Sequence, residues 1–356
     1  MEKEKTIEYI ESSFLASLIS DRDVTDISYN GSDFFYVSNT KGRMRSSMSV
    51  EHQLVKDFLR QIANLSEQQF SFSNPVLDIS IGKYRINAVH QSIGKIKDND
   101  VVTFSIRIAS EKPRIDNNSD FFTPQIVELL KELLINRQSI VIGGLTSSGK
   151  TEFQKYLLRS MRINERIIVI DNVTELDSVR DEDNIDLTCW RVDERNEFSS
   201  CSLLIKNALR NNPDWLILAE ARGKEMFDVL NSAMTGAPII TTIHSQDVKS
   251  LPFRMGRMVQ RSEQKMDYNE VLNDIYYHFH FYIYLTKEEK SGHINRFISE
   301  IAFINNKGKF FYVYKREGNN HHYYPLTNDA IYLLRNHEHS EMFNQYFVKG
   351  GDTNEQ

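Results

Sequence analysis

The sequence predicts an α/β protein in which a mostly parallel sheet is preceded by a smaller α+β N-terminal domain and followed by a C-terminal α+β lobe. Three observations support this fold class. Short apolar strands alternate with helical segments after residue 123, which is typical of parallel sheets. β-rich runs separated by turns, together with two helical patterns, occupy the first 110 residues. Glycine is scarce, at 15 of 356 residues, yet Gly143, Gly144 and Gly149 fall within seven residues at a strand–helix junction.

The N-terminal domain is expected to span residues 1–110. The spacing of its first apolar residues predicts an opening helix over residues 7–21. The alternating runs VTDISYNG and DFFYVS predict a hairpin around the turn at Asn30 and Gly31. A second amphipathic helix is expected near residues 50–64, followed by the strands VLDISIG, YRINAVHQ and VVTFSIRI.

The second domain is expected to follow a linker. The polar stretch ASEKPRIDNNSD has no hydrophobic periodicity and predicts a linker over residues 111–122. Thr123 and Pro124 then form a helix N-cap and first turn. Strands are expected at SIVI, RIIVI, WLIL and PIITTI, with helices between them, so residues 123–356 are predicted to form a mostly parallel α/β domain. Its later β-rich runs predict the C-terminal lobe, residues 247–356.

Composition excludes several classes of protein. Hydrophobic residues make up 40% and charged residues 26%, as in folded globular chains, and the net charge of −6 gives no global basic field for DNA or anionic lipid. Two cysteines, Cys189 and Cys201, are too few for a disulfide framework and favour a reducing compartment. The charged start and the lack of a run of about 18 apolar residues predict neither a signal peptide nor a membrane span. A polar surface, without a convincing metal-ligand set, is expected for the C-terminal histidines His321, His322, His337 and His339.

The glycine-rich junction carries a phosphate-binding pattern. GLTSSGKT, residues 144–151, matches GxxxxGK[ST] between a predicted strand and a predicted helix. In this motif backbone N–H groups curl around phosphates at a helix N-terminus, and glycines permit the curl. Lys150 is expected to reach the β- and γ-phosphates, and Thr151 to give its hydroxyl to Mg²⁺. The expected nucleotide-binding residues are Gly144, Leu145, Thr146, Ser147, Ser148, Gly149, Lys150, Thr151 and Glu152.

Hydrolysis also needs an acidic group near Mg²⁺ and a group that positions water. Glu220 follows the apolar strand WLILA, and a carboxylate at the C-terminal end of a parallel strand faces the ligand crevice. This Walker B position makes Glu220 a candidate catalytic residue and magnesium ligand. Glu175 follows RIIVIDNVT on the neighbouring strand, with Asp171 closer to the strand end. Glu220 and Glu175 are therefore both candidates to polarise the attacking water.

Two further polar residues are candidates for catalysis. His244 ends the strand PIITTIH, where a side chain can register the γ-phosphate and pass its loss to the next segment. Arg222, in AEARGKE, is a candidate to anchor the loop that carries Glu220 or to reach a neighbouring subunit. The alternatives are a structural histidine and a solvated arginine.

Four ordered boxes resemble those of the secretion ATPase superfamily, which serves type II and type IV secretion, conjugation and type IV pilus machines. They are GGLTSSGKT for the P-loop, RIIVIDNVTEL for the Asp box, LLIKNALRNNPDWLILAEARGKE for Walker B and TGAPIITTIHSQD for the His box. In the N-terminal half, DVTDISYNG, NPVLDISIGKYRINA and VTFSIR are most similar to the branch of conjugative type IV secretion and tight-adherence pili. The resemblance covers nearly the whole chain.

The resemblance implies a RecA-like P-loop ATPase domain and a homo-oligomeric ring, normally a hexamer. ATP and Mg²⁺ would lie between the N-terminal and RecA-like domains, and hydrolysis would drive rigid-body domain motion. Arg85 in KYRIN and Arg107 in FSIRI match family arginines that reach the phosphates. The implied partners are inner-membrane secretion or pilus components, met at the cytoplasmic face of the membrane by a peripherally associated cytoplasmic protein. Nucleic acid is implied only indirectly, as transported cargo.

The chain departs from the family pattern at several positions. Asp171 and Asn172 stand where the Asp box usually reads Glu-Asp, Ala219 replaces a glycine and Ala237 replaces a histidine. Glu152 replaces a threonine and puts a negative charge near the phosphates. These changes keep open a nucleotide-binding scaffold with weak or no turnover. A RecA-like DNA translocase, which would need a basic or aromatic track for the strand, is the other alternative.

Overall fold

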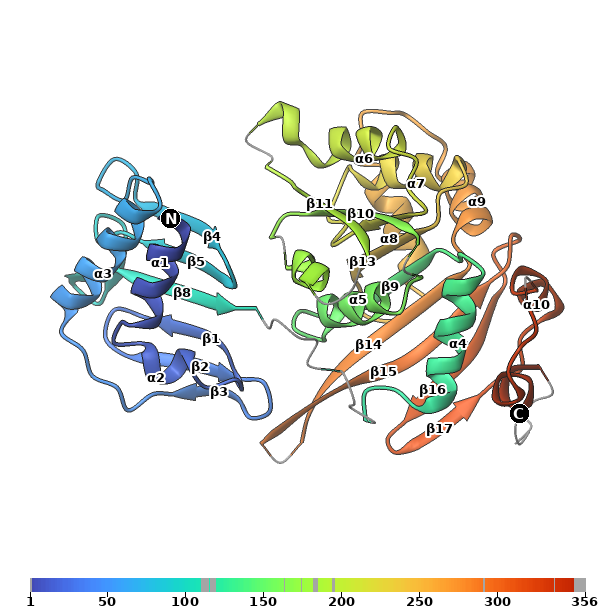
Figure 1. The fold of residues 1–356 in the computed structure, drawn as a ribbon, viewed down its shortest axis with the longest axis horizontal. Coiled ribbons are helices and arrows are strands. Elements are labelled where there is room, and N and C mark those ends of the chain that lie inside the picture. Colours follow the sequence, from blue (N-terminus) through green and yellow to red (C-terminus); the bar gives the residue numbers. More distant parts are fainter. Residues whose placement is uncertain are drawn as a thin grey trace. The chain divides into compact units, whose positions relative to one another are not determined.

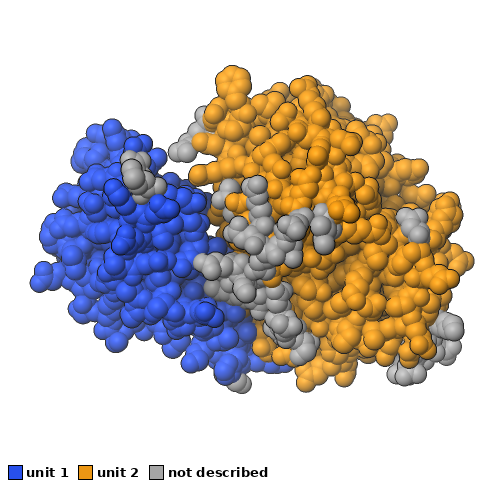
Figure 2. All heavy atoms as spheres, viewed as in Figure 1, with its two compact units in different colours: residues 1–111, 289–294 blue, residues 112–288, 295–356 orange. Residues whose placement is uncertain are grey.

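The computed structural model describes residues 2–109, 115, 120–162, 164–173, 175–181, 185–193, 196–290, 292–335 and 337–348. The chain divides into two compact units (Figure 2). Each unit has its own hydrophobic core. Unit 1 comprises residues 1–111 and 289–294, and unit 2 comprises residues 112–288 and 295–356. Most of the predicted linker, residues 111–122, lies outside the described residues.

Unit 1 contains a six-stranded antiparallel sheet in the order β3-β2-β1-β8-β5-β4 and a separate pair of short strands, β6 and β7 (Figure 1). Its elements are α1 (Glu2–Glu11), α2 (Ala16–Ile19), β1 (Val24–Tyr29), β2 (Phe34–Ser38), β3 (Gly42–Arg45), α3 (His52–Leu65), β4 (Val76–Ile81), β5 (Tyr84–Val89), β6 (Lys95–Ile96), β7 (Asn99–Asp100) and β8 (Thr103–Ile108).

Strand alternation places one face of the sheet against the helices. A row of aligned isoleucines across four strands is buried together with side chains of α1 and α3: Ile27, Ile106, Ile86 and Ile79. Because successive strand residues point to opposite faces, the adjacent row, which contains Arg107 and Arg85, lies on the face away from this core.

The predicted single helix over residues 7–21 is two helices, so that expectation is wrong. Ser12 and Ser13 lie between α1 and α2, and their hydroxyls donate to the backbone carbonyls of Glu8 and Ile10, each at 2.7 Å. Side-chain bonds of this kind offer the backbone an alternative to continued helix, and the chain turns here.

Unit 2 is built on one nine-stranded sheet in the order β11-β10-β12-β13-β9-β14-β15-β16-β17 (Figure 1). The strands from β11 to β14 pair in parallel, and β15, β16 and β17 pair antiparallel to one another. The elements are α4 (Pro124–Ile135), β9 (Ile140–Gly144), α5 (Lys150–Arg159), β10 (Arg166–Asp171), the 3₁₀ helix η1 (Leu176–Asp181), β11 (Asp186–Arg191), the 3₁₀ helix η2 (Glu197–Ser199), α6 (Cys201–Leu209), β12 (Trp215–Leu218), α7 (Met226–Met234), β13 (Ile239–His244), α8 (Leu251–Val259), α9 (Tyr268–His278), β14 (Phe281–Lys290), β15 (His293–Ile304), β16 (Phe310–Glu317), β17 (Asn320–Tyr323), α10 (Asn328–Leu333), α11 (Glu341–Phe343) and the π-helix η3 (Asn344–Val348).

Helices cover both faces of this sheet, so unit 2 has three layers. Ile140 and Ile142 of β9 pack with α4 and α5, whereas Val141 between them packs with the layer of α6 to α9. Such strands are apolar on both faces, which explains why the sequence of this region reads as short, continuous apolar runs. Among the described residues, no helix combines the length and the apolar character needed to cross a membrane.

The strands of the C-terminal part extend the same sheet. β14 lies beside β9 and pairs with it in parallel from Phe281 to Leu285. The aromatic side chains of this strand are buried in both cores; Phe281 and Tyr282 have no exposed surface. The strand that carries the phosphate-binding pattern is therefore an interior strand, flanked by β13 and β14.

Candidate nucleotide-binding site

The loop over residues 145–149 connects β9 to α5 and turns sharply at both ends. A Cβ on Gly144 would lie 2.4 Å from Ser148 Oγ and 2.8 Å from the backbone oxygen of Leu285, so only glycine fits there. Gly149 has a φ of +97°, in the left-handed region that favours glycine, and α5 begins at the next residue. These two glycines let the loop fold back over the N-terminus of α5, the arrangement that binds phosphate groups.

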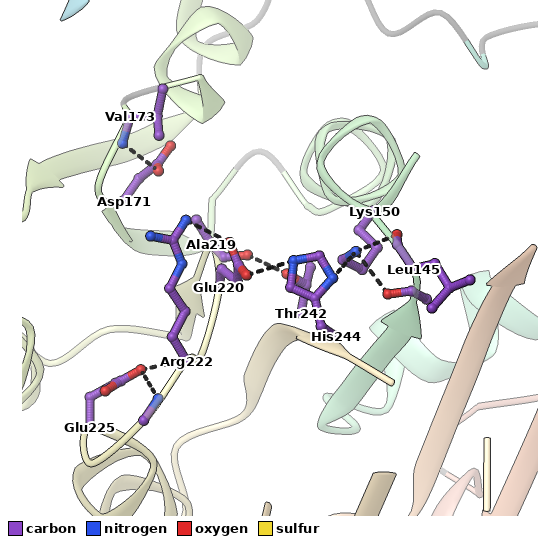
Figure 3. Close-up of polar contacts among 12 residues, drawn as sticks. Leu145, Lys150, Asp171, Val173, Ala219, Glu220, Arg222, Glu225, Thr242 and His244 are labelled. Carbon is purple, nitrogen blue, oxygen red and sulfur yellow. Dashed lines mark hydrogen bonds and ion pairs between the residues drawn. The ribbon is translucent and has the colours of Figure 1, made fainter. Parts of the chain in front are cut away.

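Lys150 lies beneath this loop. Its side-chain Nζ donates to the backbone carbonyls of Gly144 at 3.0 Å and Leu145 at 2.9 Å, and the residue is 8% exposed (Figure 3). The hydroxyl of Ser148 is buried and has no hydrogen-bond partner among the described residues. The loop thus combines a buried cation with a hydroxyl whose hydrogen-bonding capacity is unused.

A chain of polar contacts runs from Lys150 along the carboxyl ends of the strands (Figure 3). Lys150 Nζ lies 3.2 Å from His244 Nδ1, and His244 Nε2 lies 3.0 Å from Glu220 Oε1. The parallel register explains the first contact, because it sets His244 of β13 beside Gly144 of β9. An ammonium only donates, so Nδ1 accepts from Lys150, and the ring N–H at Nε2 donates to Glu220.

Arg222 completes the chain on the far side of Glu220. Its Nη2 donates to Glu220 Oε2 at 2.8 Å, and this bond holds the pKa of Arg222 above its ordinary value. The loop between β12 and α7 is fixed by Glu225, whose carboxylate accepts from the backbone N–H groups of Arg222 and Gly223. Both carboxylate oxygens of Glu220 are therefore held by side chains predicted to act in catalysis.

The end of β10 adds a buried carboxylate. Asp171 is 4% exposed and accepts from the backbone N–H of Val173 at 2.9 Å and of Leu176 at 3.4 Å. Burial raises the pKa of Asp171, the bond from Val173 works against that rise, and the charge of Glu175 adds to it. Asp171 thus shapes the turn after β10, and Glu175 lies close to it in this half-buried turn. Whether Glu175 or Glu220 acts on water stays a prediction.

Glu152 and Thr151 lie in the first turn of α5. The Glu152 carboxylate pairs with Lys155 Nζ at 3.5 Å, and the Lys155 side chain is fully buried. This pairing offsets the negative charge that the sequence places near the phosphate-binding loop. Thr151 is half-buried, and its part in binding Mg²⁺ stays a prediction.

Three polar residues at this edge were not singled out from the sequence. Gln154 Nε2 of α5 donates to the carbonyl of Leu218 at 3.2 Å, Thr242 Oγ1 donates to the carbonyl of Ala219 at 2.7 Å, and Arg296 Nε of β15 donates to the carbonyl of Ser147 at 2.8 Å. A polar residue on the buried face of α5 was a usable signal for Gln154. Nothing in the sequence connects Arg296 with a loop about 150 residues earlier.

Arg85 and Arg107 belong to unit 1. They are directly paired across β5 and β8 and so share the face of the sheet that lies away from the helices. Carboxylates lie beside both arginines. Arg85 Nε is 3.9 Å from Asp78 Oδ1, and Asp26 of β1 is paired with Arg107 across the sheet. Their contribution to phosphate binding stays a prediction.

Comparison with known proteins decides the family. Residues 94–273, half of the chain, match the family model described as type II/IV secretion system protein. The chain belongs to this family. An uncharacterized protein of Bacillus anthracis is 31% identical over 293 residues, which cover 78% of this chain and 64% of that relative. The type IV secretion system protein VirB11 of Brucella suis is 31% identical over 128 residues, which cover 35% of this chain and 36% of VirB11. These alignments therefore span less than two thirds of either relative.

The fold of this secretion-family protein also has solved counterparts. The structure of the ATPase DotB from Legionella pneumophila superposes with a TM-score of 0.62 at 17% identity, covering 82% of this chain and 79% of DotB. At this identity the likeness concerns the fold alone. It matches an α/β architecture with a small antiparallel sheet in the N-terminal unit and a larger, mostly parallel sheet in the second.

Proposed function

We propose that this type II/IV secretion family protein is an ATP-hydrolysing hexameric motor of a secretion, conjugation or pilus-assembly apparatus. One observation carries the proposal: the phosphate-binding loop is joined to the Walker B carboxylate by the contacts from Lys150 through His244 to Glu220. A loop that only bound nucleotide would not need an acidic group linked to its lysine. The membership of type IV secretion proteins such as VirB11 among its relatives supports the cellular role.

The residues of the loop suit ATP with Mg²⁺. Gly144 leaves no room for a side chain, Ser148 offers a buried hydroxyl, and α5 presents its N-terminus to the loop. Thr151 and Glu220 are the residues we assign to the magnesium ion. When bound, Mg²⁺ offsets phosphate charge and fixes the geometry of the reacting phosphoryl group.

The protein's own groups would then perform three tasks. Lys150 would leave the loop carbonyls and contact phosphate oxygens, because an ammonium gains more from a charged acceptor. Glu220 would orient the attacking water. His244, which contacts both side chains, would change its contacts when Lys150 moves, and it would signal the state of the nucleotide to the Walker B strand.

The cellular setting is part of the same proposal. A hexameric ring at the cytoplasmic face of the membrane, in contact with inner-membrane components of the apparatus, fits a family of secretion proteins. Arg85 and Arg107 would reach the nucleotide from unit 1, so that hydrolysis changes the relation between the two units.

Steady-state phosphate release with Mg-ATP tests the proposal. In Lys150→Ala the rate of phosphate release is expected to fall at least about 100-fold, because nucleotide binding and the stabilisation of phosphate charge both depend on the ammonium group. Glu220→Gln is expected to bind ATP normally and to release phosphate at a similarly reduced rate. Lys307→Ala, at an exposed lysine of the same unit, is the control and should match the wild type.

Particle mass measured with ATP supplies the second readout, with a hexamer expected. Wild-type turnover by Lys150→Ala would refute the site. Tight ATP binding by the wild type without phosphate release would instead support a scaffold and point to Asn172, Ala219 and Ala237. Turnover stimulated only by DNA would support the translocase.

A further inference from the structure

Two histidines of the C-terminal segment converge on one buried carboxylate of α4. Glu132 lies in α4, and His337 and His339 lie in the segment between α10 and α11. His337 Nε2 is 3.2 Å from Glu132 Oε1, and His339 Nδ1 is 2.9 Å from Glu132 Oε2. The ligand-type atoms of the three residues all lie within 4.8 Å of one another. The sequence alone did not connect His337 and His339 with Glu132, because Glu132 comes from a helix about 200 residues earlier.

The carboxylate is unusually placed for an acidic residue. The Glu132 side chain is only 4% exposed, although it carries a carboxylate. Leu129 and Leu133 of the same helix are apolar and pack into the core. A charged carboxylate rarely occupies such a position unless partners compensate for its lost hydration. The His339 side chain is 13% exposed, and that of His337 is 33% exposed, so the cluster is closed on the inside and open to ions on the side of His337.

The three side chains touch one another directly, by contacts of 3.2 Å and 2.9 Å. In a tetrahedral site with bonds of about 2.0–2.1 Å, ligand atoms lie about 3.3 Å apart, so an ion would replace these direct contacts with little movement of the side chains. Two imidazoles and one carboxylate favour divalent transition metals over Mg²⁺ or Ca²⁺, which prefer oxygen ligands. Three protein ligands leave a fourth position for water.

Neighbouring groups hold the ligands in place. Asn136 Nδ2 donates to the Glu132 carbonyl at 2.8 Å, which fixes the last turn of α4. Asn344 Nδ2 donates to the His339 carbonyl at 3.2 Å, and the ring of Phe343 lies 4.6 Å from the His339 ring. Such outer contacts set the orientation of ligands in metal sites.

We propose that Glu132, His337 and His339 bind a divalent transition-metal ion of the zinc class, which fastens the C-terminal segment to α4. We assign this ion a structural role, because it would link Glu132 to His339, 207 positions later in the chain. Its ligands belong to other elements than the phosphate-binding loop. Metal binding adds stability because the unfolded chain cannot bring the ligands together.

Zinc binding by the full chain without an affinity tag and without nucleotide tests this proposal. Protein stripped with a chelator is titrated with Zn²⁺, bound metal is counted after dialysis, and melting is followed in parallel. One Zn²⁺ per chain and a higher melting temperature are expected. Co²⁺ substituted for Zn²⁺ should give the visible absorption of a site with nitrogen ligands, and excess Mg²⁺ should not displace it.

Three variants separate the cluster from chance binding by histidines. Glu132→Gln and His337→Ala should each weaken zinc binding at least about tenfold and lose the zinc-dependent rise in melting temperature. His337→Ala is the gentler change because its side chain is partly exposed. The double variant His293→Ala/His322→Ala removes two histidines outside the cluster and should bind zinc as the wild type does. Equal zinc binding by His337→Ala and the double variant, or no saturable binding by the wild type, would overturn the proposal and leave an ion-paired cluster.

Discussion

Glu220 has both carboxylate oxygens engaged, one by His244 and one by Arg222, and this arrangement defines the site at the scale of single residues. A carboxylate with two such partners is oriented before any ligand arrives. Pre-orientation lowers the cost of positioning a reacting group, because less motion must be frozen during the reaction. The residue before Glu220 is also fixed, because the Ala219 carbonyl accepts from the Thr242 hydroxyl.

The pH dependence of stability offers a test at Asp171. Its pKa is raised above the ordinary value of 3.8, chiefly by burial, so between 3.8 and the raised value the folded protein binds more protons than the unfolded chain. Its contribution to stability therefore falls as the pH rises through this window and is constant above it. Asp171→Asn removes the titration. Relative to the wild type, the variant should gain stability with rising pH, by about 1.4 kcal/mol for each unit by which the pKa is raised.

Melting temperatures of the two proteins from about pH 4 to about pH 8 measure this difference. Asp177→Asn, at an exposed residue of the same segment, is the control and should show no such trend. A difference between Asp171→Asn and the wild type that stays constant across the range would contradict the raised pKa.

The sequence predicted most of the polar residues at the carboxyl ends of the strands. It did not predict which distant side chains pair with each other. The positions of Lys150, Glu220 and His244 after apolar strands predicted that they lie at one edge of the sheet, and the structure brings them within hydrogen-bonding distance. Their roles in catalysis stay predictions. Pairings such as Glu132 with His339 depend on how distant elements pack, which no local pattern reports.

At the scale of elements, α5 carries the site because one of its faces is anchored in the core. Phe153 is fully buried, and its ring lies 5.9 Å from Phe121 and 6.4 Å from Tyr156. The helix therefore cannot shift without disturbing an aromatic cluster. Its N-terminus is held rigidly beneath the phosphate-binding loop.

Phe153→Ala is expected to lower the free energy of unfolding of unit 2 by about 3–5 kcal/mol, because it leaves a large cavity. Urea unfolding followed by tryptophan fluorescence is suitable, since both tryptophans of the chain, Trp190 and Trp215, belong to unit 2. Leu203→Ala on α6 removes a side chain that is 42% exposed and should cost less than about 1 kcal/mol. Equal losses in the two variants would show that Phe153 does not anchor the helix.

The prediction of elements succeeded where strands are buried on both faces. The apolar runs predicted β9, β10, β12 and β13, whereas β11 was missed. β11 is an edge strand with the sequence DLTCWR, in which only the second residue is fully buried, so its apolar content is too low to identify a strand. Residues 7–21 were predicted as a single helix because the prediction used only the spacing of apolar residues. That spacing carries no information about the serine side chains that hydrogen-bond to the backbone between α1 and α2.

For the whole molecule, the fold class followed from the alternation of strands and helices, and the order of strands did not. The alternation of strands and helices along the chain predicts parallel strands, but it does not predict their order in the sheet. β9 lies between β13 and β14, although both come much later in the chain. Strand order depends on which long crossovers pack best, and that information is spread over both faces of the sheet.

A variant in unit 1 tests, for the whole molecule, the proposal that arginines of this unit act in the reaction. Arg107→Ala is expected to lower the rate of phosphate release at least about tenfold, because a cation near the phosphates stabilises the developing charge. The melting temperature should change little, since the Arg107 side chain is exposed on the face away from the core. Arg43→Ala, at an exposed arginine of β3, should leave both quantities unchanged. A wild-type rate for Arg107→Ala would remove unit 1 from the catalytic site.

The interior position of β9 also dictates when the site can form during protein synthesis. A nascent chain emerges from its N-terminus, but both neighbours of β9 are strands encoded far downstream, and residues 281–285 are the later of the two. Until those residues leave the ribosome, one edge of β9 is unpaired and the loop after it lacks the backbone of Leu285 that confines Gly144. A ribosome-bound chain should therefore acquire nucleotide affinity late, after most of unit 2 has been translated.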